Sequence, residues 1–240
     1  VDYTPIPSEV WVDDDYAPGT CGGHTWGYDA FSKIQDGIDA VSGSTVHVAS
    51  GTYYENIVLK DGVELLGAGS ATTIIDGMQN GSVVTAVGVG NTTVFDSFTV
   101  TNGSGTYDAS WSGFCGGGMF NNNDSSPVIT GCVFRDNVAR SGGGMCNNNK
   151  SSPYITRCIF WNNSAQMGGG ACDGQSSSSF TDCIFWNNSA GMSAGGLLSI
   201  MSETVITNCT FWNNSASADG AIANVDAFPI ITNCIFWNDS

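Results

Sequence analysis

The sequence predicts an all-β fold, a single-stranded right-handed parallel β-helix of roughly eight coils with a short capping helix near its N-terminal end. A repeat of 25 or 26 residues runs through the second half of the chain. Within each repeat, short β-branched and aromatic segments alternate with Gly, Asn and Ser, which are strand and turn signals. No helical 3.6-residue pattern is present in the repeats. Such a period suits one coil of a solenoid in which each coil contacts only its neighbours.

The segments follow one another in a simple order. Residues 1–29 are expected to form an N-terminal strand and extension, and residues 30–42 a helix that caps the first coil. Four apolar residues at helical spacing predict this helix: Phe31, Ile34, Ile38 and Val41. Residues 43–240 should form the β-helix, with regular coils from residue 116. Its first strands are expected at 45–48, 57–59, 63–66, 73–75 and 83–87.

The charge balance limits the possible partners. The 240 residues include 22 acidic and 6 basic side chains, which gives a net charge of −16. Binding to phosphates requires a basic surface, so nucleic-acid partners and anionic membranes are not expected. No apolar run is long enough for a membrane span. The chain starts at Val1 rather than Met, which we interpret as the processed end of a secreted or cell-surface protein.

The second half of each repeat predicts the core. A Cys is followed two residues later by a Phe, and both should point inward because alternate residues of a strand share a face. The two columns are Cys132, Cys158, Cys183, Cys209 and Cys234, and Phe134, Phe160, Phe185, Phe211 and Phe236. We interpret the cysteines as buried free thiols, because parallel Cβ vectors do not favour disulfides. Five residues after each Cys, a column of Asn or Asp should form an amide ladder.

A Trp follows the Phe in four of the repeats. These residues should point outward, and they are Trp161, Trp186, Trp212 and Trp237. Such an apolar stripe is rarely left uncovered on a monomer. Either another chain, a loop or a sugar covers it, or the rings stack on one another along the solenoid.

Asn-x-Ser/Thr sequons are dense in this chain, and four of them recur in register beside the Trp residues. These four begin at Asn162, Asn187, Asn213 and Asn238. Others begin at Asn80, Asn91, Asn102, Asn123 and Asn149. We predict glycosylation at these positions, which would form a stripe of sugars along the outside. The alternative is that turns rich in Asn and Ser produce sequons by composition alone.

The register Ile-Thr-Asn-Cys-x-Phe-x-x-Asn, followed by Gly-Gly-Gly, resembles the right-handed β-helix repeat proteins of the pectate-lyase-like superfamily. The resemblance covers roughly residues 45–240. It implies the fold more firmly than the function, because the superfamily includes lyases, hydrolases, epimerases, adhesins and chains without known activity. This chain looks most similar to non-catalytic, secreted members.

Few residues offer catalytic chemistry. A lyase site needs calcium-binding carboxylates beside an Arg or Lys base. Arg135, Lys150 and Arg157 lie on nearby coils, but no acids accompany them at matching positions. We therefore expect no catalytic residues, no enzyme and no cofactor. Three consecutive acids, Asp13, Asp14 and Asp15, offer oxygen ligands that could bind calcium. We interpret them instead as an acidic surface turn.

These features favour an extracellular structural protein. The sequence stops in mid-coil, and an uncapped coil exposes strand edges that can pair with another chain. We predict a glycosylated fibril subunit that assembles head to tail, with copies of itself or glycans as partners. The alternative is a carbohydrate-active β-helix, either a polysaccharide lyase or a polysaccharide-binding module. A second alternative is an adhesin-like surface domain.

Overall fold

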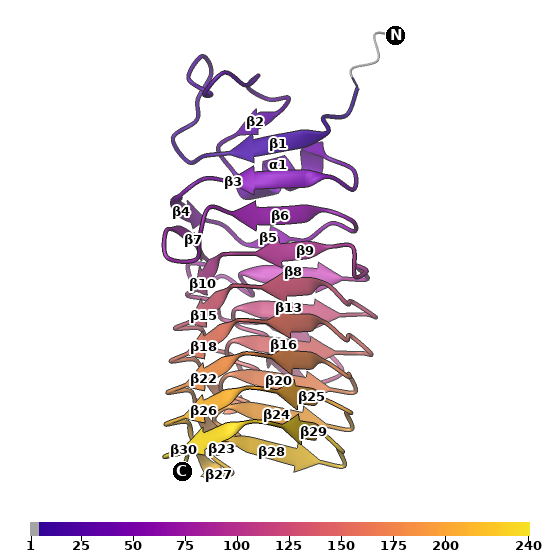
Figure 1. Ribbon diagram of the computed structural model, residues 1–240, viewed down its shortest axis with the longest axis vertical. Helices are drawn as coiled ribbons and strands as arrows, with labels where there is room; N and C mark the ends of the chain where they lie inside the picture. Colours follow the sequence, from indigo (N-terminus) through magenta and orange to yellow (C-terminus); the bar gives the residue numbers. More distant parts are fainter. Residues whose placement is uncertain (1–4) are drawn as a thin grey trace.

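The computed structural model describes residues 5–240, which form a right-handed parallel β-solenoid of about seven turns. Figure 1 shows the coils stacked along the long axis, with the first coil at one end and the C-terminus at the other. This architecture confirms the fold class that the repeat predicts. Residues 1–4, which belong to the expected N-terminal extension, lie outside the described residues.

Three parallel sheets run along the solenoid. The ten-stranded sheet contains β2 (Ala30–Phe31), β1 (Glu9–Val12), β3 (Thr45–Val48), β6 (Glu64–Gly67), β9 (Val94–Asp96), β14 (Val128–Thr130), β17 (Tyr154–Thr156), β21 (Ser179–Thr181), β25 (Val205–Thr207) and β29 (Ile230–Thr232). The eight-stranded sheet contains β4 (Gly51–Tyr54), β7 (Thr73–Asp76), β10 (Thr99–Thr101), β15 (Val133–Arg135), β18 (Ile159–Trp161), β22 (Ile184–Trp186), β26 (Thr210–Trp212) and β30 (Ile235–Trp237). The seven-stranded sheet contains β5 (Ile57–Val58), β8 (Val84–Val87), β13 (Met119–Asn122), β16 (Met145–Asn148), β20 (Ala171–Gly174), β24 (Leu197–Ile200) and β28 (Ile222–Val225).

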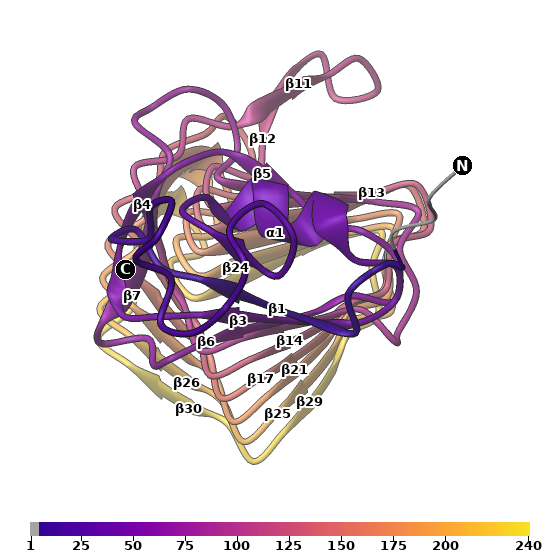
Figure 2. The ribbon, with the colours of Figure 1, turned by 90° about the horizontal axis from the view of Figure 1, so that it is seen from above.

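Two smaller sheets complete the fold. A short parallel sheet is formed by β19 (Ser164–Met167), β23 (Ser189–Ser193) and β27 (Ser215–Ala218). An antiparallel hairpin, β11 (Thr106–Asp108) and β12 (Gly113–Cys115), extends outward from the coils (Figure 2). Trp111 at its turn packs against Gly174, where a Cβ atom would lie 2.0 Å from the indole. Arg140 donates a 3.0 Å hydrogen bond from Nη1 to the carbonyl of Trp111 and thereby ties the hairpin to the solenoid.

One helix, α1 (Ile34–Ala40), covers the first coil (Figure 2). Two residues of this helix, Ile34 and Ile38, are fully buried in the core, as expected from their spacing. Glu55 accepts hydrogen bonds from the backbone N–H groups of Ile34 (2.8 Å) and Gln35 (3.1 Å), which have no partners within the helix. Glu55 thus satisfies two backbone donors at the start of the helix that closes this end of the core. Within residues 5–240, no helix is long and apolar enough to cross a membrane.

The interior is built from stacked columns of identical side chains. Phe160, Phe185 and Phe211 stack with ring centroids 4.7 and 4.6 Å apart and are fully buried. The Cys column lies beside them, and the nine cysteines within the described chain are free thiols. Burial raises the pKa of the Cys158 thiol well above its ordinary value, so the thiol stays neutral and packs as a small apolar group.

The bend before each Cys has a left-handed backbone. Arg157, Asp182 and Asn208, at equivalent positions, have φ angles of 52°, 55° and 55°. Asn and Asp tolerate this conformation better than most residues, which explains their recurrence at the bend. The bend turns the chain from the ten-stranded to the eight-stranded sheet and lets both the residue before it and the Cys after it face the core.

Candidate functional site

Two columns of outward side chains run along the eight-stranded sheet. The middle residue of β15, β18, β22 and β26 is a buried Phe, so the first and third residues of these strands face outward. The first column contains Val133, Ile159, Ile184 and Thr210, and the second contains Arg135, Trp161, Trp186 and Trp212. Trp237 continues the second column on the last strand. Because every strand pairs in register, chemically similar groups recur once per coil.

The Trp rings stack on one another and also remain partly exposed. The Trp161 and Trp186 centroids are 5.3 Å apart with an interplanar angle of 11°, and Trp186 and Trp212 are 5.4 Å apart at 9°. Trp212 keeps 46% of its surface exposed.

An apolar groove of about 390 Å³ lies between the two columns. Its walls are the rings of Trp161, Trp186 and Trp212 on one side and the aliphatic side chains of the first column on the other. We call this feature the Trp groove. Since its walls belong to successive coils, it follows the long axis of the solenoid.

A ladder of exposed amides borders the Trp column. Asn187, Asn213 and Asn238 each donate from Nδ2 to Oδ1 of the preceding Asn, at 3.1, 2.9 and 2.8 Å. The ladder ends at Asp136, whose carboxylate accepts from Asn162 at 2.6 Å and from Arg135 at 2.6 Å. We call this feature the outer amide ladder. It gives the Trp groove a polar edge and places one ion pair at the end nearer the N-terminus.

The predicted sequons occupy different environments. Asn162, Asn187, Asn213 and Asn238 are exposed in the outer amide ladder, and Asn80, Asn91 and Asn123 are exposed in turns. Asn102 and Asn149 are partly buried, and their Nδ2 atoms donate to Asp76 (2.8 Å) and Asn122 (2.7 Å). Glycosylation at these positions stays a prediction.

The three basic residues considered for a lyase site do not converge. Arg135 lies on β15 beside the Trp column. Arg157 lies at the bend after β17, where Nη2 donates to Thr130 Oγ1 at 2.9 Å. Lys150 lies in the turn after β16, on another side of the coil. Neighbouring coils therefore place these three residues at different points of the turn.

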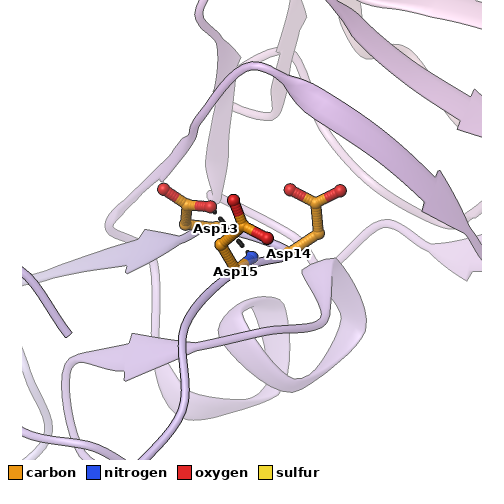
Figure 3. Close-up of side chains that lie close together, drawn as sticks. All are labelled: Asp13, Asp14 and Asp15. Atoms are coloured by element: carbon orange, nitrogen blue, oxygen red, sulfur yellow. Dashed lines mark hydrogen bonds between the residues drawn. The ribbon is translucent and has the colours of Figure 1, made fainter. Parts of the chain in front are cut away.

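The acidic triplet forms a surface turn after β1. Asp13, Asp14 and Asp15 place their carboxylate oxygens within 4.8 Å of one another (Figure 3). Asp13 accepts from the backbone N–H of Asp15 at 3.0 Å, and Asp14 accepts from that of Thr52 at 3.3 Å. Calcium usually takes six to eight oxygen ligands, so this turn supplies only part of a coordination shell. Calcium binding here stays a prediction.

A buried acid that the repeat pattern does not reveal lies inside the solenoid. Asp173 on β20 is fully buried and accepts hydrogen bonds from Asn147 (2.6 Å), Ser178 (2.7 Å) and Thr204 (2.8 Å). Burial raises the pKa of its carboxyl group, and these three hydrogen bonds oppose the shift. No charged partner balances it among these contacts, so Asp173 is a structural polar group rather than a surface site.

Comparisons with known proteins agree with this architecture. No curated protein sequence matches the chain. A pectin methylesterase from carrot has a TM-score of 0.57 and 12% identity, covering 100% of this chain and 86% of the carrot chain. The pectin methylesterase from Aspergillus niger, in deglycosylated form, has a TM-score of 0.58 and 16% identity, covering 99% and 88%. A pectin methylesterase in complex with hexasaccharide VII has a TM-score of 0.55 and 11% identity, covering 90% and 80%.

These structures correct one expectation about the protein's function and change which of two others is preferred. The expectation that the chain is not an enzyme is contradicted, because several solved structures that share its fold are pectin methylesterases. It rested on the lack of acidic residues at positions matching Arg135, Lys150 and Arg157. The comparisons also favour the alternative of a carbohydrate-active β-helix. Neither they nor the structure support the prediction of a fibril subunit.

Sequence and structure lead to the same family. The coils predicted from the 25- and 26-residue spacing are present as stacked parallel strands. At 11–16% identity, the solved structures establish the shared fold. Residues 86–240 match the family described as "Right handed beta helix region", which is more than half of the chain. The chain belongs to this right-handed β-helix family.

Proposed function

We propose that this protein is a carbohydrate-active β-helix that binds and modifies a linear polysaccharide lying along the Trp groove. The observation that carries this proposal is the regular spacing of 5.3 and 5.4 Å between the centroids of the Trp rings that form one wall of the groove. A polymer with a repeating unit can contact equivalent groups on successive coils. A compact ligand would use only one or two of them.

The chemistry of the groove suits a sugar polymer. The aliphatic wall and the Trp edges can contact the C–H surfaces of sugar rings, while indole N–H groups and the outer amide ladder can hydrogen-bond with hydroxyls. Asp136 is the carboxylate at the edge of this surface, held in place by Arg135 and Asn162. We propose that it reacts with the substrate, as a general base or a nucleophile.

The similar structures support this interpretation. Several of them are pectin methylesterases, and two are described in complex with a hexasaccharide. A polysaccharide substrate also suits a protein located outside the cell, as the sequence predicts. Glycosylation of the exposed sequons fits the same location.

The proposal can be tested with a panel of neutral, methyl-esterified and acetylated polysaccharides. Binding is measured by affinity electrophoresis, and activity by released methanol, acetate or new chain ends. At least one polymer should bind, and Trp186→Ala should weaken its binding at least tenfold, because a central aromatic contact is worth about 2 kcal/mol. Tyr154→Ala is the matched control, since Tyr154 is 53% exposed on the ten-stranded sheet.

A second variant separates binding from reaction. Asp136→Asn keeps the shape of the site and should lower product formation at least a hundredfold, as expected for the loss of a general base, while binding changes little. The proposal fails if no polysaccharide binds or reacts, or if Trp186→Ala and Tyr154→Ala bind the polymer equally well.

A further inference from the structure

The two outward columns of the eight-stranded sheet continue beyond the Trp groove toward the N-terminal end of the solenoid. The strands β18, β15, β10, β7 and β4 follow one another along this face (Figure 1). In the column of the Trp rings, Tyr54 on β4 lies three strand steps beyond Arg135, and Thr52 holds the matching place in the aliphatic column. Both columns end at a pocket of about 230 Å³, which we call the β4 pocket. Its lining includes Asp14, Ser32, Lys33, Thr52, Tyr54 and Glu55.

Tyr54 presents an exposed aromatic ring at the β4 pocket. It keeps 62% of its surface exposed, whereas its neighbour Tyr53 is buried in the core at 2%. Since alternate residues of a strand share a face, Tyr54 points outward at the position that a Trp occupies on β18, β22 and β26. A tyrosine ring offers an apolar face to the C–H surface of a sugar, and its hydroxyl can donate or accept a hydrogen bond. The β4 pocket therefore repeats the type of aromatic contact that the Trp groove provides.

Polar groups surround this ring, and the backbone holds two of them in place. Asp14 Oδ2 accepts from the backbone N–H of Thr52 at 3.3 Å, and the Glu55 carboxylate accepts the two bonds from the start of α1. Lys33, the residue before α1, is exposed and lines the same pocket. Its ammonium group and the hydroxyls of Ser32 and Thr52 add hydrogen-bond donors. Donors, acceptors and one aromatic face match a ring that carries hydroxyl groups, and the fixed carboxylates need little ordering when such a ring binds.

The stretch between the Trp groove and the β4 pocket offers few contacts. On β10 the outward residues Thr99 and Thr101 are only 5% and 4% exposed, and Thr99 Oγ1 donates to the carbonyl of Ser70 at 2.6 Å. Other parts of the chain therefore cover this strand. From Trp161 to Tyr54 the sheet crosses four strand steps of about 4.8 Å each, which is roughly 19 Å. A polymer on this face would contact the protein at two places separated by this interval.

We propose that the β4 pocket is a second subsite, which binds a sugar ring of the polysaccharide whose other rings lie in the Trp groove. This inference rests on the proposed function, because it takes the same polymer as its ligand. A chain long enough to reach both places binds the second one as an intramolecular event, so its affinity exceeds that of a fragment confined to the Trp groove. The β4 pocket thereby favours long chains over short ones.

Calorimetry with fragments of increasing length, titrated into the whole protein, tests the second subsite. Once a fragment fills the Trp groove, Kd should stay level over the next few sugars and then fall a second time, by about tenfold, when the chain reaches the β4 pocket. Tyr54→Ala should remove this second fall and leave the Kd of short fragments unchanged. Lys33→Ala, which leaves the aromatic ring in place, should reduce it. Tyr154→Ala is the control, since Tyr154 is a comparably exposed tyrosine on another sheet.

Trp186→Ala separates this subsite from the Trp groove. It should weaken fragments that are too short to reach β4, which Tyr54→Ala leaves unchanged. If Trp186→Ala does so but the wild type shows no second fall, or Tyr54→Ala binds the longest fragments as tightly as the wild type, the subsite is refuted while the Trp groove stands. If Trp186→Ala binds fragments of every length like the wild type, the proposed function is refuted, and the subsite with it.

Discussion

At the residue scale, buried amides hold neighbouring coils together. Asn188, in the inner column five residues after Cys183, is fully buried. Its Oδ1 accepts from the backbone N–H and from Nδ2 of Asn163, both at 3.0 Å. Its Nδ2 donates to the carbonyl of Phe160 at 2.8 Å and to Asn214 Oδ1 at 3.0 Å. One side chain thus hydrogen-bonds with groups on both neighbouring coils, which explains why Asn recurs at this position.

Replacing this residue tests its role in stability. Asn188→Ala leaves several buried groups without partners and should lower the free energy of unfolding by roughly 2–4 kcal/mol. Asn187→Gly is the control, because Asn187 is exposed and its φ of 54° suits glycine; its effect should stay within about 1 kcal/mol. Urea unfolding followed by circular dichroism measures both, and equal losses would contradict the account of the inner column.

Asp173 predicts a pH dependence of stability. Its folded-state pKa is raised by burial, so the folded protein holds this proton more tightly than the unfolded chain. The stabilising contribution is present below the ordinary Asp value of 3.8 and is lost as pH rises through the raised pKa. Asp173→Asn removes the titrating group, so its melting temperature should exceed that of the wild type by a margin that grows with pH. A margin that stays constant between pH 3.5 and 7 would contradict this prediction.

Residue-level prediction from the sequence works where one residue type fills a column. The Cys, Phe and inner Asn columns are visible because each coil repeats them at a fixed spacing. The column that contains Asp173 is different, since Asn121, Asn147, Asp173 and Ser199 replace one another along it. No alternation pattern distinguishes this inward position from a surface position, so the burial of Asp173 could not be predicted.

At the element scale, repeated glycines allow successive turns to approach closely. A Cβ atom on Gly169 would lie 2.4 Å from the carbonyl oxygen of Ser189 and 2.6 Å from that of Gly195. The equivalent atom on Gly143 would lie 2.5 Å from the oxygen of Gly169. The Gly-Gly-Gly register that identifies the repeat is therefore required by contact between backbones of adjacent coils.

This requirement predicts different effects for two glycines. Gly169→Ala forces backbone carbonyls apart and should destabilise the protein by about 2 kcal/mol or more. Gly191→Ala is the matched control, because a Cβ atom there meets only the Ala165 oxygen at 4.0 Å; it should be neutral or slightly stabilising. Thermal unfolding compares the two variants. Similar melting temperatures would show that close approach is not the reason for the glycine.

A hairpin outside the repeat was not predicted from the sequence. The β11–β12 hairpin occurs once, between two coils, so no period reveals it. It is held by contacts distant in sequence, including Asp108 with Asn148 at 2.9 Å and Trp111 with Gly174. The stacking of His24 on Trp11, with ring centroids 4.0 Å apart, was missed for the same reason, because a loop rather than a shared spacing brings His24 to this position.

At the scale of the whole molecule, the stacked coils place equivalent side chains next to one another along the surface of the solenoid. The outward position of the Trp column follows from the strand alternation, and it was predictable from the sequence. The function was not, because the same coils serve enzymes and structural proteins alike. What distinguishes this chain is the combination of the Trp groove, the outer amide ladder and the Arg135–Asp136 pair at one end.

The most direct test of the central claim is how affinity depends on the length of the ligand. Fragments of defined length, prepared from the polysaccharide that binds best, are titrated by calorimetry against the wild type and Trp186→Ala. A polymer lying along the Trp groove predicts that Kd falls with each added sugar until the fragment spans Trp161 to Trp212, and that Trp186→Ala weakens the longer fragments most. Affinity that is independent of length, or identical length curves for the two proteins, would contradict the proposed site.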